Sequence, residues 1–121
     1  MRTILWRRGL RYRKNVKTLP GKPDVVFSAA RVIVFCDGDF WHGRDWKQLS
    51  RKLRNGSNAS YWISKIKANR NRDRRNDRLL RREGWSVIRI WESDIHGDSE
   101  QAARTIEELV RKNSRGRNAI R

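Results

Sequence analysis

Two short apolar runs in the first third of the chain set the expected centre of the fold. Residues 24–27 (DVVF) and 31–35 (RVIVF) are rich in β-branched side chains, and only three small residues separate them. This pattern predicts the paired strands of one hairpin. Asp24 opens the first strand and Asp37 follows the second, so we expect the two carboxylates to converge close to His42.

Helical spacing, capping residues and turn residues predict the other elements. Helices are expected at residues 1–9, 46–53, about 60–83 and from about 98 to 112, a short edge strand at 10–13, and a core strand at 85–91. Gly9 and Gly84 are typical helix stop residues. This order of elements predicts an α/β fold with a mixed central sheet flanked by helices.

The length of 121 residues indicates a single domain, which we place at residues 1–112. The last residues, 113–121, are basic and are expected to form a flexible tail. Met1 stands almost inside the first helix, with no capping residue before it. That helix is therefore expected to be truncated or only marginally stable.

Charge narrows the possible partners. The chain has 30 Lys and Arg against 13 Asp and Glu, for a formal net charge of +17, together with six Trp. This excess favours a polyanionic partner, most simply nucleic acid. The basic stretch KANRNRDRRNDR in the long helix is either a solvated face or a surface that follows phosphates, and the global charge favours the second interpretation.

Other classes of protein fit the sequence less well. The chain has neither a run of about 18 apolar residues nor a signal peptide, so we expect no membrane partner and an intracellular, cytoplasmic location. Cys36 is the single cysteine, which excludes an intrachain disulfide and a cysteine-rich zinc cluster. It is more plausible as a small strand residue than as a nucleophile.

The acidic residues of the hairpin suggest metal chemistry. One or two carboxylates with backbone carbonyls and waters suffice to hold Mg²⁺ and leave positions open for phosphate oxygens. Asp24 and Asp37 are the candidate ligands. His42 is the candidate proton acceptor, because an imidazole can take a proton near neutral pH.

Five segments, in chain order, resemble the very short patch repair endonucleases, which nick DNA at T:G mismatches left by deamination of 5-methylcytosine. They are GLRYR (9–13), LPGKPDVVF (19–27), the DGxFWHG run (37–43), YWxxKIxxNxxRD (61–73) and GWxVxxIWE (84–92). The resemblance implies a restriction-endonuclease-like three-layer fold. It also implies a Mg²⁺-dependent endonuclease that nicks one strand of double-stranded DNA, and we expect it to act as a monomer.

The resemblance also assigns roles to particular residues. Asp24 matches the metal-binding aspartate, and the main-chain carbonyl of Cys36 matches a second ligand. Asp37 stands where the family often has His, and it keeps a group able to bind metal or orient water. His42 matches the histidine that activates the attacking water. The matched residues expected to contact DNA are Phe40, Trp41 and Trp62, as wedges beside the mismatch, and Lys65, Asn69 and Arg72 on the long helix.

Two departures from the family keep alternatives open. The family has an acidic residue in its N-terminal helix, upstream of the segment matching residues 1–9. Typical members also bind a structural zinc, but the matching positions here are Asp39, Arg44, Trp46 and Ser93, so we expect no zinc and a polar clasp formed by Asp39 with Arg44 or Ser93. The alternatives are a site-specific nicking or homing-type endonuclease of the same fold, or a catalytically impaired DNA-binding module.

Overall fold

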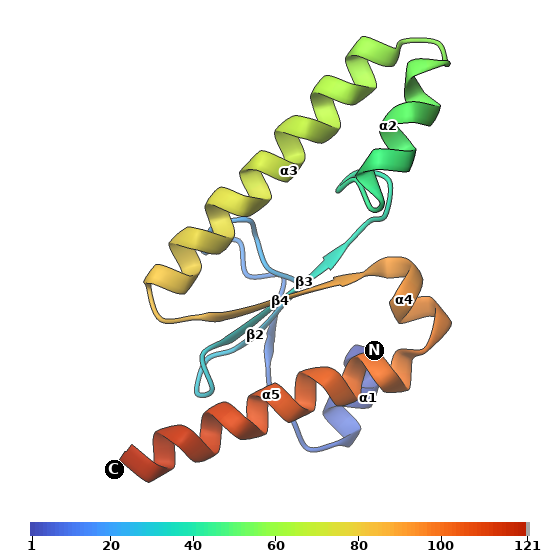
Figure 1. Cartoon of the computed structure of the whole chain (residues 1–121). Coiled ribbons are helices and arrows are strands. Elements are labelled where there is room, and N and C mark those ends of the chain that lie inside the picture. The colour runs from blue at the N-terminus through green and yellow to red at the C-terminus, as the bar shows by residue number, and fades with distance from the viewer. Residues whose placement is uncertain (121) are drawn as a thin grey trace.

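The computed structural model describes the backbone of residues 1–120 and the side chains of residues 1–115. Helices lie on both sides of a central sheet (Figure 1). The elements, in chain order, are α1 (Arg2–Arg7), β1 (Arg13–Lys14), β2 (Val25–Phe27), β3 (Val32–Asp37), α2 (Trp46–Arg54), α3 (Ala59–Arg82), β4 (Ser86–Trp91), α4 (Glu92–Gly97) and α5 (Ser99–Ile120).

The sheet is mixed, as the order of elements predicted. Its strands lie in the order β1-β2-β3-β4, with β1–β2 and β2–β3 antiparallel and β3–β4 parallel. The predicted hairpin is confirmed, since Val25 pairs with Val34 and Phe27 with Val32. The parallel register places Asp37 beside Trp91 at one end of the sheet. Long helix α3 provides the crossover that such a parallel pair requires.

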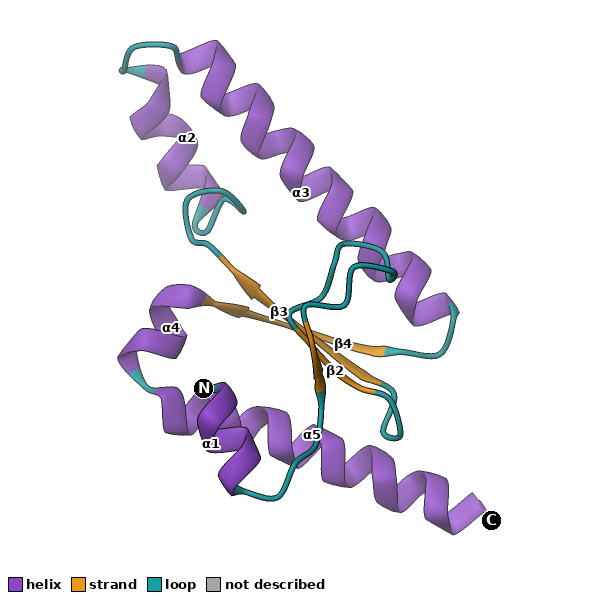
Figure 2. Ribbon diagram, turned by 180° about the vertical axis from the view of Figure 1, so that it is seen from behind, coloured by secondary structure: helices purple, strands orange, loops and turns teal. Residues whose placement is uncertain are grey.

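Alternating side chains of the hairpin form two apolar layers. Val25, Phe27, Val32 and Val34 pack with α1 and α5, whereas Val26, Ile33 and Phe35 pack with Leu80 of α3. Figure 2 shows α3 and α5 on opposite sides of the strands. Burial of each large aliphatic side chain contributes about 1.5–3 kcal/mol, so a shift of one residue in either strand would exchange the two layers at large cost.

The short first helix is anchored by tertiary contacts. Leu5 is fully buried, and Arg8 pairs with Glu107 of α5 at 3.0 Å. Gly9 follows with φ of +83°, in the left-handed region that suits a helix end. Packing against α5 therefore offsets the lack of an N-terminal capping side chain, which the sequence had marked as a weakness.

Three elements differ from the sequence predictions. The edge strand is limited to residues 13–14 instead of 10–13, and residues 92–97 form helix α4, where a loop was expected. Residues 113–120, which the sequence analysis assigned to a tail, continue helix α5. At the start of this stretch, Asn113 Nδ2 donates to the Ala30 carbonyl at 3.0 Å. The last position of the expected tail, Arg121, lies outside the described residues.

Within the described part of the chain, no helix combines the length and the apolar character needed to cross a bilayer.

Candidate active site

Three side chains from different elements meet where β3 ends. Asp37 is the last residue of β3, His42 lies in the loop that follows, and Asp73 comes from the middle of α3. Each offers a ligand atom, and these atoms lie within 4.8 Å of one another. His42 Nδ1 is 2.6 Å from Asp73 Oδ2 and 3.9 Å from Asp37 Oδ1. The structure therefore brings together two of the predicted catalytic residues and adds a third, Asp73, which the sequence analysis did not select.

Asp37, His42 and Asp73 can meet because the loop after β3 packs closely against α3. Gly43 has φ of +69°, and a Cβ built on it would lie 2.9 Å from both Ile66 and Arg70 of α3. Any larger residue would push the loop away from the helix. Because the neighbouring residue is His42, Gly43 sets how near the imidazole comes to Asp73.

The surroundings shift two pKa values in the cluster. The hydrogen bond from His42 to Asp73 raises the pKa of the imidazole, and the charge of Asp37 adds to this effect. A carboxylate can only accept, so His42 donates from Nδ1, which leaves Nε2 free as a base. Burial raises the pKa of Asp37, while its ion pair with Arg89 opposes that rise.

Asp24 directly precedes β2 and has a different setting. Its Oδ2 accepts a hydrogen bond from the backbone N–H of Cys36 at 2.7 Å. Asp24 and Cys36 line a hollow together with Asn15, Glu92 and His96. The group of ligand atoms around His42 includes Asp37 but not Asp24. The two carboxylates of the hairpin thus have different immediate partners.

The hollow at Asp24 offers donors that suit a hard cation. Asp24 and Glu92 supply carboxylate oxygens, and Cys36 lines the same space. Burial raises the pKa of the Cys36 thiol to about 11, with Asp24, Asp37 and Glu92 adding to the rise, which argues against a thiolate nucleophile at neutral pH. The residues therefore fit a divalent ion bound through oxygen.

Glu92 and Asp73 were missed by the sequence analysis, although a signal was present. Asp73 is the last residue of the matched segment YWxxKIxxNxxRD, and Glu92 ends the segment GWxVxxIWE. Asp73 lies in the segment that the sequence analysis interpreted as a basic helix, and Glu92 directly follows the predicted core strand. Their significance depends on which face of the sheet they reach, and sequence spacing alone does not determine that.

An aromatic cluster stands at the surface close to His42. Phe40, Trp41 and Trp62 lie with ring centroids 5.3–5.7 Å apart. Phe40 is 37% and Trp41 46% exposed, so neither side chain belongs to the core. Trp62 lies in the first turn of α3, and its ring packs against both Phe40 and Trp41, which the sequence left undecided. An exposed group of large aromatics is unusual unless it contacts a partner.

Polar residues of α3 border the aromatic cluster. Lys65 Nζ lies 5.9 Å from the centre of the Trp41 ring, and Asn69 Nδ2 donates to the Trp41 carbonyl at 2.9 Å. Arg72 donates to Asn69 one turn further along the helix. The three predicted DNA-contacting residues of α3 therefore share one surface with the aromatic cluster, and Asn69 also fixes the loop that carries it.

The predicted polar clasp is present at the positions that match the zinc ligands of typical very short patch repair endonucleases. Arg44 NH1 contacts Asp39 at 3.3 Å, Ser93 Oγ at 2.6 Å and Asp94 at 3.1 Å. The Ser93 backbone N–H also donates to Asp39 at 3.1 Å. These bonds join the loop after β3 to the start of α4. Trp46 is not part of the clasp, and Arg70 lies over its ring instead.

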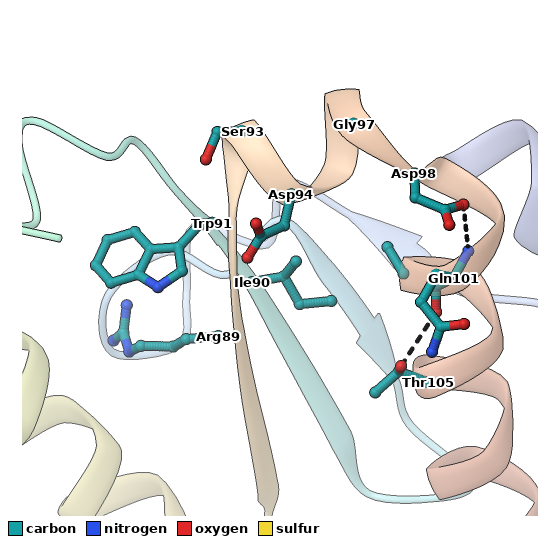
Figure 3. Close-up of a pocket in the computed structure, with 10 residues that line it drawn as sticks. Arg89, Ile90, Trp91, Ser93, Asp94, Gly97, Asp98, Gln101 and Thr105 are labelled. Carbon is teal, nitrogen blue, oxygen red and sulfur yellow. Dashed lines mark hydrogen bonds between the residues drawn. The ribbon is translucent and has the colours of Figure 1, made fainter. Parts of the chain in front are cut away.

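A second, more apolar hollow lies between β4, α4 and α5, with Ile90, Trp91 and Thr105 in its wall (Figure 3). It shares Arg89 with the surroundings of Asp37 and shares Ser93 and Asp94 with the clasp, but it contains neither Asp24 nor His42. The chemistry of a phosphodiester needs the acidic and imidazole groups. Asp24 and the His42 cluster, and not this hollow, therefore form the candidate active site.

Carboxylates suited to a divalent ion, an imidazole with a free nitrogen and a basic, aromatic surface are the groups that a metal-dependent nuclease needs. The family of DNA mismatch endonuclease Vsr matches residues 1–48. The type II nicking enzyme V.NmeDIP of Neisseria meningitidis serogroup C is 43% identical over 107 residues, which cover 88% of this chain and 71% of that protein. V.HpaIIP of Haemophilus parainfluenzae, also a type II nicking enzyme, is 41% identical over 106 residues, or 88% and 74% of the two chains. The DNA mismatch endonuclease Vsr of Escherichia coli K12 is 33% identical over 95 residues, covering 78% and 59%.

The chain belongs to the Vsr family, and it is accordingly a DNA endonuclease. This finding confirms the resemblance read from the sequence motifs.

Proposed function

We propose that this protein is a Mg²⁺-dependent endonuclease of restriction-endonuclease-like fold that nicks one strand of double-stranded DNA at or near a T:G mismatch, acting as a monomer. The observation that carries the proposal is the position of the His42–Asp73 pair. It joins the loop that holds the exposed Phe40–Trp41 pair to α3, close to the acidic end of the hairpin. The proposed general base, His42, and the proposed wedge residues, Phe40 and Trp41, thus lie in one short loop.

The proposed roles follow from the geometry of each side chain. Asp24 and the carbonyl of Cys36 would hold Mg²⁺, which neutralises charge developing on the scissile phosphate when bound. His42 takes a proton from the attacking water at Nε2. Asp73 fixes the tautomer of His42 and stabilises the imidazolium that forms. Asp37, buried beside them, helps to orient His42 through its charge.

DNA binding is assigned to the surface formed by α3 and the loop after β3. Phosphates would pair with the exposed basic residues of α3, including Lys65 and Arg72, and this pairing is independent of sequence. The aromatic cluster would insert between base steps. Insertion costs a few kcal/mol and costs least where base pairing is already weak, so it favours a mismatch.

A second candidate is nicking at a defined site without dependence on a mismatch. It is favoured by the names of V.NmeDIP and V.HpaIIP, which are called type II nicking enzymes. The hydrogen-bonded clasp at the positions of the family zinc also marks a difference in the loop that carries the aromatic wedge.

A cleavage assay separates these possibilities. The protein is incubated with end-labelled duplexes that carry T:G or G:C at one position, and with supercoiled plasmid, in Mg²⁺ or in EDTA. We expect a nick in one strand of the T:G duplex that requires Mg²⁺. Equal nicking of T:G and G:C duplexes would support the site-specific alternative, and binding without cleavage would support the impaired DNA-binding module.

A further inference from the structure

Arg89 lies at the centre of the acidic groups around His42. It is on β4, directly beside Phe35 in the parallel register, and its guanidinium packs 4.1 Å from the centre of the Phe35 ring. The side chain is only 19% exposed. This position points the guanidinium at the face of the sheet that α3 covers, which is the face that also receives Asp37.

Three carboxylates surround the guanidinium. Arg89 NH1 lies 2.9 and 3.2 Å from the two oxygens of Asp37, and NH2 lies 2.8 Å from Asp77. Nε also donates to Asp77 at 3.0 Å, and Asp73 Oδ1 is 3.7 Å from NH1. Asp73 and Asp77 are one helical turn apart, so both project from the same side of α3. The planar fork of an arginine suits such paired acceptors.

Charge explains why a cation is needed here. Asp37, Asp73 and Asp77 place three carboxyl groups at low exposure around the single guanidinium of Arg89. Like charges held close together in a partly buried site repel strongly. An arginine remains protonated in proteins, so it supplies this compensation at every working pH.

The ion pair between Asp37 and Arg89 also affects whether a metal ion can bind at His42. Asp37, His42 and Asp73 are close enough together to hold a cation. Asp37, however, already gives both its oxygens to Arg89 NH1. A divalent ion on these ligands would have to draw Asp37 away from Arg89 and would lie next to the guanidinium charge. Both effects oppose binding of the ion.

We propose that Arg89 is the resident cation of the Asp37–His42–Asp73 cluster and excludes a divalent metal ion from it, so that the enzyme holds its metal ion at Asp24 alone. The inference rests on the proposed function for the site at Asp24. In this arrangement Arg89 is a positioning residue: it fixes Asp37 and Asp77, and it leaves His42 free to act as a base instead of a metal ligand.

The test measures metal binding where cleavage plays no part. Asp24→Asn removes the proposed metal site, and Mn²⁺ binding to the DNA-free protein is followed by electron paramagnetic resonance. We expect Asp24→Asn to bind no Mn²⁺ specifically, and Asp24→Asn/Arg89→Gln to bind about one ion per chain through Asp37, His42 and Asp73, once Asp37 is released from Arg89. Asp24→Asn/Arg89→Lys keeps a cation and should bind none. Arg31→Gln in the same background is the matched control, because Arg31 lies over Trp85, away from the cluster.

Two results would overturn the inference: specific Mn²⁺ binding by Asp24→Asn with Arg89 intact, or no gain in binding by a folded Asp24→Asn/Arg89→Gln protein. Thermal melts establish that each variant is folded. If the Gln variant does not fold, adding Asp77→Asn removes one uncompensated charge and keeps the three ligands. A protein that nicks no DNA would contradict the proposed function, but it would leave these binding results unchanged, so the two failures are distinguishable.

Discussion

His42 Nδ1 lies 2.6 Å from Asp73 Oδ2, and this bond joins the loop after β3 to the middle of α3. The two residues are 31 positions apart in the sequence. The pairing gives the imidazole the tautomer that a general base needs and raises its pKa.

The pH dependence of cleavage tests this pair. A base acts only when unprotonated, so the rate should rise with pH through the raised pKa of His42. Asp73→Asn removes the main cause of the raised pKa of His42, so we expect the ascending limb of the pH–rate profile to move to lower pH. The plateau rate should fall by about 10²-fold, because the imidazolium loses its partner. Rates of nicking between pH 5 and 9 measure both effects. Glu108→Gln on the exposed side of α5 is the control, and an unmoved limb in Asp73→Asn would argue against His42 as the base.

The clasp should make the fold independent of zinc. Because Arg44, Asp39 and Ser93 form hydrogen bonds at the family zinc positions, we expect metal analysis to find no stoichiometric zinc and EDTA to leave the melting temperature unchanged. Arg44→Ala should lower that temperature by a few degrees and reduce nicking, since the loop that carries His42 loses the Arg44 part of its attachment to α4 and keeps only the bonds between Asp39 and Ser93. One tightly held zinc per chain would contradict this interpretation.

Mismatch preference should depend on Trp41. Its side chain is 46% exposed, so Trp41→Ala should keep the fold and the binding of matched duplex, but lose most of the preference for T:G over G:C. Trp6→Ala is the matched control, because Trp6 is 52% exposed on α1. Thermal melts and cleavage rates on both duplexes measure the effect. A large fall in melting temperature with equal loss on both duplexes would place Trp41 in a structural role.

Affinity for DNA should fall steeply with salt. With about 6 phosphate contacts, the logarithm of the binding constant should fall with a slope of about −5 against the logarithm of the salt concentration. Fluorescence anisotropy of a labelled duplex between low and moderate salt gives this slope. A flat response would argue against the basic surface of α3 as the DNA-binding face.

The sequence predicted the framework well, because periodic apolar residues reported which strands and helices are buried. The hairpin, α2, α3 and β4 follow from such patterns, and Gly84 ends α3 as expected, with φ of +93°. Helix α4 was missed because its six residues contain no apolar repeat. Past residue 112 the helix begins with Asn113, whose side chain bonds to Ala30 and Ser86, and a basic composition does not reveal such tertiary contacts.

The site was only partly predictable for a related reason. Motif positions identified Asp24, Asp37 and His42, but the partner of each depends on which face of the sheet it reaches. Asp37 points toward α3 and pairs with Arg89, whereas Asp24 bonds to the backbone of Cys36. Arg89 stands in a strand segment that otherwise reads as core, so its role becomes apparent only when β4 is placed beside β3.

Cleavage by Asp24→Asn tests the central claim most directly. The account predicts that this variant loses Mg²⁺-dependent nicking of the T:G duplex while its affinity for that duplex stays the same or increases, because a metal ligand and one charge that repels phosphate are both removed. Asp45→Asn is the control, since Asp45 is exposed and makes no side-chain capping bond at the start of α2. Undiminished nicking by folded Asp24→Asn protein would contradict the assignment of the metal site.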